Sequence, residues 1–156
     1  MNSAYSSIVR GLKALRENKR GKKMIYGILN LTQHVATHEQ IEAGVFEPSA
    51  EDKKMIQKLL TFNDIPTRGE MHDRAATVAA IAVKYFTDEY DPREDHRGYA
   101  MIGGAPYFMG FLERHLSGED IGQLYAFSKR ESIDQVQPDG SVKKTAVFRH
   151  CGFVEV

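Results

Sequence analysis

The chain has 156 residues, which is enough for one domain with a sizeable buried core. Hydrophobic residues make up 42% and charged residues 27%, an ordinary balance for a globular protein, and no run of 18 apolar residues predicts a membrane span. The single cysteine, Cys151, excludes an intrachain disulfide framework and a cysteine-based zinc site, and it favours a cytoplasmic location.

Positive charge is concentrated at the N-terminus, although 21 basic and 21 acidic residues give a net charge of zero. Residues 1–23 contain seven Lys or Arg and one acidic residue, so they carry +6 and the rest of the chain −6. We therefore predict a basic amphipathic N-terminal extension over 1–23 and a single domain over 24–156. The spacing of Ile8, Leu12 and Leu15 predicts a helix in the extension.

The first half of the domain reads as one strand followed by three helices. Residues 24–31, MIYGILNL, predict a buried strand. The THEQ sequence at 37–40 fits a capping box that opens a short helix, and residues 49–60 predict a second helix with a serine cap. A further capping box at 67–70 opens a helix over 68–87, whose many alanines predict close packing against a sheet.

The second half returns to strands. Residues 99–104, YAMIGG, predict a short strand that leads into a helix over 106–116, with proline at its first position. Residues 122–128 predict another strand. Residues 131–156 then predict a β-hairpin, because the Asp-Gly of PDG at 138–140 supplies the positive φ that such turns need.

This order of elements predicts the fold class. Strands that alternate with helices favour a parallel sheet with helices packed on it. We therefore expect an α/β fold: a small Rossmann-like sandwich with a central, mostly parallel sheet and a C-terminal antiparallel β-hairpin.

Polar, glycine and cationic residues follow the three strands that we expect to be parallel. In open α/β sheets of this kind, ligands bind beyond the carboxyl ends of the strands. The first strand leads into NLTQH, the second into the glycine pair, and the third into SKR. The predicted ligand-binding residues are Asn30, Thr32, Gln33, Gly103, Gly104, Ala105, Tyr107, Ser128, Lys129 and Arg130.

The glycine pair Gly103-Gly104 indicates the chemistry of the ligand. A helix start offers unpaired N–H groups and about half a positive charge, and glycines let the backbone approach a ligand closely. Such a site suits a phosphate, a nucleotide or a carboxylate. GGAPYF is neither the dinucleotide fingerprint nor a P-loop, and no cofactor is predicted. The alternative is that the glycines only turn the chain from strand to helix.

The sequence IGGAPYFMGFL resembles the Gly-Gly motif of CRISPR-associated Rossmann-fold (CARF) domains, and the terminal hairpin fits that family. Gly103 and Gly104 match the motif, and Met109 and Leu112 fit its helix, while Ala105 stands where the family usually has Thr or Ser. The resemblance implies a sensor of cyclic oligoadenylate that acts as a homodimer. Some small members are ring nucleases, which cleave that ligand.

Two other functions stay open. If the site cleaves a phosphodiester without a metal, His34 is the predicted general base, and Lys129 and Arg130 would stabilise the developing charge. Alternatively, the chain is a non-enzymatic interaction protein whose basic N-terminal helix contacts nucleic acid or a protein through residues 8–23. No metal site is predicted, since the expected cap at Thr37 breaks the helical spacing of the nearby histidines.

Overall fold

The computed structural model describes residues 14–17, 23–86 and 98–156. Its centre is a five-stranded sheet in the order β4-β3-β5-β6-β7. The first four strands in this order run parallel, and β7 is antiparallel to β6, which confirms the predicted fold class. The strands are β3 (Ile28–Asn30), β4 (Val45–Phe46), β5 (Gly98–Ile102), β6 (Ile121–Val136) and β7 (Val142–Glu155).

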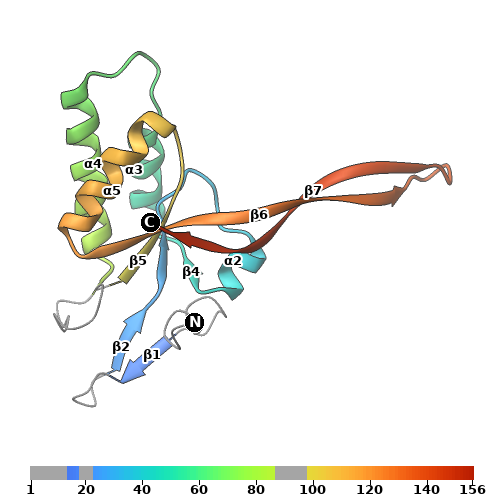
Figure 1. Cartoon of the computed structure of the whole chain (residues 1–156), viewed down its shortest axis with the longest axis horizontal. Coiled ribbons are helices and arrows are strands. Elements are labelled where there is room, and N and C mark those ends of the chain that lie inside the picture. Colours follow the sequence, from blue (N-terminus) through green and yellow to red (C-terminus); the bar gives the residue numbers. More distant parts are fainter. Residues whose placement is uncertain (1–13, 18–22, 87–97) are drawn as a thin grey trace.

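Helices cover the two faces of the sheet unequally. The long helices are α3 (Ala50–Leu60), α4 (Arg68–Val83) and α5 (Pro106–Gly118), and they gather on one side of the sheet (Figure 1). Short α2 (His38–Glu42) lies on the other side. Within the described ranges, no helix has the length and apolar character that a membrane crossing requires.

Each face of the sheet has its own hydrophobic cluster, because neighbouring residues of a strand point to opposite faces. The larger cluster joins Leu29 and Ile102 to the buried residues of the three long helices. The smaller one contains Ile28, Met101 and Leu124, with Val45 from the edge strand. The parallel strands are therefore packed on both faces, which holds their carboxyl ends in place.

The predicted helix starts are confirmed. The Thr37 side chain accepts a hydrogen bond from Gln40 N, and the Gln40 side chain accepts one from Thr37 N, which makes the capping box complete. Ser49 caps α3, and Thr67 caps α4. α4 is shorter than predicted, because its regular helix ends at Val83.

The prediction of one strand over 24–31 is wrong. Two strands replace it: β2 (Lys23–Tyr26), which spans the predicted boundary at 23/24, and β3, with Gly27 between them. The Phe46 ring lies close against Gly27, since a Cβ atom built there would lie 2.6 Å from it, so a larger residue would have to displace the ring.

The predicted N-terminal helix is also wrong where the structure describes it. Residues Ala14–Glu17 form β1, which pairs antiparallel with β2. Pairing between strands therefore outweighs the helical spacing of apolar residues at this point. The remainder of that predicted helix, including Ile8 and Leu12, lies outside the described residues.

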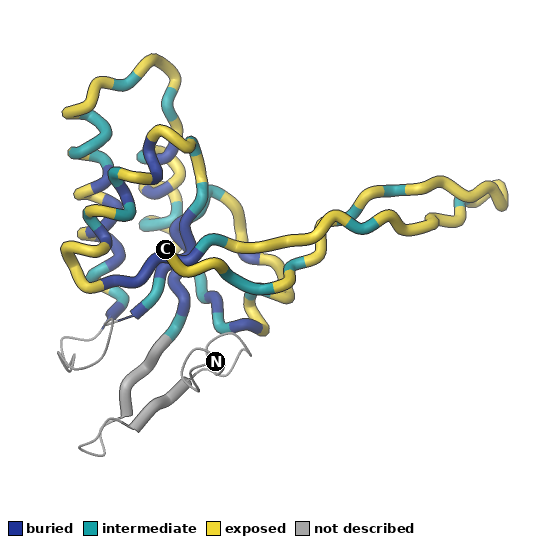
Figure 2. Tube along the Cα trace, in the orientation of Figure 1, coloured by how far each residue is buried: buried dark blue, intermediate teal, exposed yellow. Residues whose placement is uncertain are grey.

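A long two-stranded arm leaves the sheet. β6 does not end at Ser128 as predicted but continues to Val136, paired along its length with β7. We call residues 128–150 the arm; it projects far from the body and is mostly exposed (Figures 1 and 2). A β-bulge at Cys151, where the register shifts between Phe127 and Ser128, marks its base. The predicted turn is confirmed, with Gly140 at φ +82°.

Candidate functional site

A cavity of 390 Å³ lies at the carboxyl ends of the parallel strands. We call it the strand-end cavity. It brings together two of the predicted groups: the residues that follow β3 and the glycine pair that follows β5. The lining residues are Thr32, Gln33, His34, Val35, Thr37, Gln40, Met101, Ile102, Gly103, Gly104, Tyr125 and Ala126.

Asn30 holds the loop after β3 in place from below. It is fully buried, and its amide nitrogen donates to His34 O and to Glu47 Oε1, both at 2.8 Å. Its amide oxygen accepts from Thr32 N and Thr32 Oγ1, at 2.9 and 2.7 Å. Asn30 was predicted to bind ligand; because these bonds occupy both ends of its side chain, the structure places it beneath the cavity instead.

Glu47 and Lys53 complete this support. Glu47 accepts from Ala36 N at 2.6 Å and forms an ion pair with Lys53 Nζ at 3.0 Å. Burial raises the pKa of Glu47, but the hydrogen bonds from Ala36 and Asn30 and the charge of Lys53 outweigh that effect, so the pKa lies below its ordinary value. The carboxylate therefore stays ionised and keeps the loop in one conformation.

Lys53 also orients two peptide groups of the loop. Its ammonium donates to Thr32 O at 3.0 Å and to His34 O at 2.8 Å. In a trans peptide the N–H points away from the C=O, so the N–H groups of Gln33 and Val35 point away from the ammonium. Neither N–H has an acceptor among the described residues. Both residues line the strand-end cavity, which makes their N–H groups candidates for binding a ligand.

The glycine side of the cavity leads into an uncapped helix. Ala105, the N-cap of α5, makes no side-chain hydrogen bond, and Pro106 has no N–H. A Cβ atom at Gly103 would lie 3.7 Å from Thr32 Cγ2, an ordinary contact, so the backbone approaches the opposite loop closely there. The start of α5 thus presents its positive end beside the cavity.

Tyr125 forms another wall. Its hydroxyl donates to Glu113 Oε1 on α5 at 2.6 Å. Burial, together with this hydrogen bond and the negative charge of Glu113, raises the pKa of Tyr125. The phenol therefore stays protonated and fixed toward α5, and it offers its ring to the cavity.

His34 is exposed at the mouth of the cavity. Its backbone carbonyl is fixed by Asn30 and Lys53, while its imidazole forms no hydrogen bond or ion pair with any described residue and is free to turn toward a ligand. The neighbouring histidine, His38, pairs with Glu42 at 3.0 Å instead. Within the described ranges, no three His, Cys, Asp or Glu side chains are grouped to hold a metal ion.

The third predicted group does not reach the cavity. Ser128, Lys129 and Arg130 lie on the arm, because β6 continues through them instead of ending. They are exposed and pair with His150, Arg149 and Phe148 of β7.

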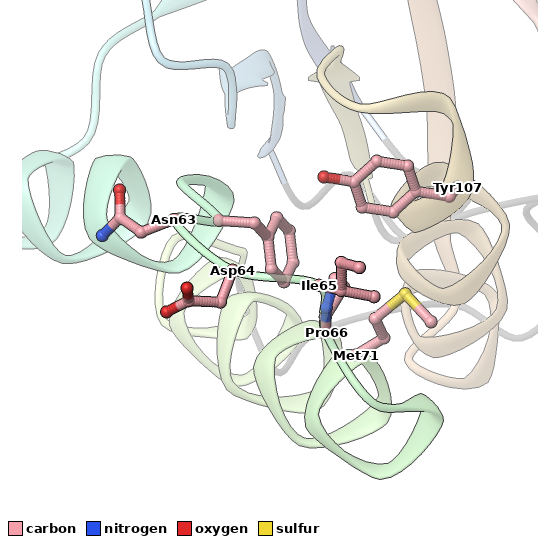
Figure 3. A pocket seen from close by; sticks show the side chains of 7 residues that line it. Asn63, Asp64, Ile65, Pro66, Met71 and Tyr107 are labelled. Carbon is pink, nitrogen blue, oxygen red and sulfur yellow. The ribbon is translucent and has the colours of Figure 1, made fainter.

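Two predicted residues at the start of α5 also lie elsewhere. Ala105 is not among the lining residues of the strand-end cavity. Tyr107 faces a second cavity, lined by Phe62, Ile65 and Met71 among others (Figure 3). Successive residues of a helix point in different directions, so the side chain of Tyr107 points away from the glycine pair. Proximity in sequence therefore does not bring Tyr107 to the first cavity.

The prediction missed several residues of the site. Thr37 and Gln40 were predicted only as a helix cap, and Tyr125 and Ala126 lie just before the assumed strand end. Glu47 and Lys53 support the loop from segments distant in sequence. Only the capping box offered a local signal that α2 begins beside the loop.

The fold and the cavity together define a small α/β sandwich protein with a candidate ligand site at its strand ends. The chain belongs to the uncharacterized protein MJ1673 family, whose model matches residues 26–154. This match covers both the cavity and the arm. No curated protein and no solved structure matches the chain.

Proposed function

We propose that the protein binds a small phosphorylated anion, such as a nucleotide, in the strand-end cavity. One observation carries the proposal: the loop after β3 and the glycine pair before the uncapped α5 line the same cavity. The loop offers the N–H groups of Gln33 and Val35, and the glycine pair lets a ligand approach the positive end of α5.

The lining residues narrow the class of ligand. None of the described residues that line the cavity is Lys or Arg, and Lys53 is engaged behind the loop. The negative charge of a ligand would therefore be met by backbone N–H groups and by the His34 imidazole. This arrangement favours one phosphate group with an uncharged remainder that packs on Tyr125 and Met101.

The resemblance to CARF domains adds cyclic oligoadenylate to the candidates and supports a homodimer as part of the proposal. A cytoplasmic location likewise stays a prediction, which rests on the single cysteine.

The test is a thermal-shift screen against inorganic phosphate, mononucleotides, dinucleotides and cyclic oligoadenylates. A ligand at 100 times its Kd stabilises by about 2.7 kcal/mol, which raises the Tm by several degrees. Gly103→Leu should abolish the shift, because its side chain enters the cavity from a position with room for a Cβ atom. Gly110→Leu is the matched control: Gly110 lies within α5, a Cβ atom there meets nothing within 4 Å, and the variant should keep the full shift.

No shift with any phosphorylated compound, or an equal shift in both variants, would contradict the proposal. If a bound phosphodiester is also cleaved, His34→Ala should abolish turnover while binding persists. Deletion of residues 1–23 should leave the shift unchanged; loss of binding in that variant would favour the N-terminal extension as the binding element.

A further inference from the structure

One face of the arm carries apolar side chains that its own body does not cover, beside the charged residues Arg130, Asp134 and Lys144. The register pairs Val136 with Val142 at the tip and Arg130 with Phe148 nearer the base, so these valines and Phe148 share one face. Val136, Val142 and Phe148 are 72%, 61% and 74% exposed. A two-stranded hairpin is marginally stable at best in water, so such a face is stabilised when another surface covers it.

The tip is too far from the body to be covered by it. From Ser128 to Val136, a strand extends roughly 27 Å at about 3.4 Å per residue. The ribbon points away from the body over this whole length (Figure 1). A surface that covers the tip must therefore belong to another molecule.

Charge favours the body of a second copy over its arm. The arm has five basic and three acidic residues, a net charge of +2. The described residues between 27 and 127 include seven basic and eleven acidic residues, a net charge of −4. Two arms would repel each other, whereas an arm and a body attract.

One surface of the body matches the tip. The second cavity, which we call the loop pocket, has a volume of 610 Å³ and is lined by Phe62, Asn63, Asp64, Ile65, Pro66, Met71 and Tyr107. Ile65 is 98% exposed and Tyr107 53% exposed, although both are apolar or aromatic.

The loop pocket also carries a charge that suits the arm. In Figure 3, Ile65, Met71 and Tyr107 lie on one side of the pocket, and the Asp64 carboxylate extends on the other. Asp64 forms no ion pair with any described residue. On the arm, Lys144 lies on the same face as Val142, while Lys143 lies on the opposite face.

We propose that the arm of one protomer docks in the loop pocket of a second copy of this chain, with Val136 and Val142 against Ile65 and Tyr107. Lys144 of the docked arm then lies beside Asp64. Two copies exchange their arms reciprocally, which gives a closed two-fold dimer. The proposal does not depend on the strand-end cavity, since none of its residues is used.

The first test is the molar mass in solution, measured by light scattering over a range of protein concentrations. The full chain should form a dimer, and Val142→Glu and Ile65→Glu should each raise the dimer Kd at least about tenfold. Ile41→Glu changes a half-exposed apolar residue of α2 outside both sites and should leave the dimer unchanged. A chain that stays monomeric at about 100 μM would overturn the proposal.

Charge exchange tests the orientation. Asp64→Lys and Lys144→Asp should each weaken the dimer, and the two together should restore most of the affinity. Lys143→Asp, on the opposite face, should not be rescued by Asp64→Lys. Equal rescue by both lysine variants would show that the predicted face is wrong.

Cross-linking separates the docking modes. In a Cys151→Ser background, Ile65→Cys and Val142→Cys chains mixed together should form a disulfide-linked dimer under oxidation. Dimers formed by Val142→Cys alone would show arm-to-arm pairing and would overturn the proposal. A monomeric protein whose arm binds labelled duplex DNA, with binding lost when Lys144 is replaced, would also overturn the proposal.

Discussion

Asn30 shows how one side chain can organise a loop. Its amide group joins β3 to the Thr32–His34 backbone and to Glu47, while all of it is buried. Buried polar groups of this kind are costly to leave unpaired, so the loop has one favourable arrangement. The cavity wall is therefore built before any ligand arrives.

Replacement of this side chain should be costly. We expect Asn30→Leu, which keeps a similar size, to lower the free energy of unfolding by about 2–4 kcal/mol, because Glu47 and the loop backbone lose their partners. Denaturant unfolding measures this change. Asn63→Leu, at an exposed position, should change the free energy by less than about 0.5 kcal/mol. Equal losses in the two variants would show that the hydrogen bonds of Asn30 do not contribute to the free energy of unfolding.

The lowered pKa of Glu47 predicts that its contribution to stability is lost at acid pH. Because its folded-state pKa lies below the ordinary value of 4.5, its contribution to stability is present above pH 4.5 and is lost as the pH falls through the folded pKa. Glu47→Gln should therefore be less stable than the parent at pH 7, and the difference should shrink below pH 4.5. Unfolding free energies at pH 7, 5, 4 and 3 test this, and a difference independent of pH would contradict it.

At the level of elements, the features that depend on a few neighbouring residues were predicted correctly. Three helix caps, the proline that opens α5 and the Asp-Gly turn are written in a few neighbouring residues each, and all are confirmed. Non-local features were not. β4 has two residues and exists only through its pairing with β3.

The arm shows why the end of β6 was mispredicted. Residues 128–132 are polar, which normally indicates that a strand has left the core. In a ribbon with both faces exposed, polar residues continue the strand, and the hydrophobic pattern gives no end point. Three of the ten predicted ligand-binding residues, Ser128, Lys129 and Arg130, lie away from the cavity for this reason, while the Thr32–His34 loop and the glycine pair are brought together.

The arm should be separable from the body. Its side chains belong to neither hydrophobic cluster, so replacing residues 130–148 by Asn-Gly, between Lys129 and Arg149, should shift the Tm by only a few degrees. Circular dichroism follows the melting, and light scattering on the same sample should show a monomer. Loss of cooperative melting would show instead that the body needs the arm to fold.

At the scale of the whole molecule, the strand-end cavity and the loop pocket lie on separate parts of the fold. The strand-end cavity is assembled from the loop between β3 and α2, the first turn of α2, the end of β5 with the glycine pair, and two residues within β6. The loop pocket lies between α3, α4 and the start of α5. The two surfaces meet near the start of α5: Gly104, just before the helix, lines the strand-end cavity, whereas Tyr107, in its first turn, lines the loop pocket. No single stretch of sequence contains either surface, which is why neither could be outlined completely from the sequence.

β6 connects the cavity to the arm without interruption. Tyr125 and Ala126 line the cavity, and two residues further along the same strand the arm begins. One continuous strand thus links the proposed ligand site to the proposed dimer contact. If filling the cavity changes how firmly the arm is held, thermodynamic linkage requires the dimer to change ligand affinity by the same factor. The ratio of the dimer Kd measured without and with saturating ligand gives that factor, and a value of one means that the two sites are not coupled.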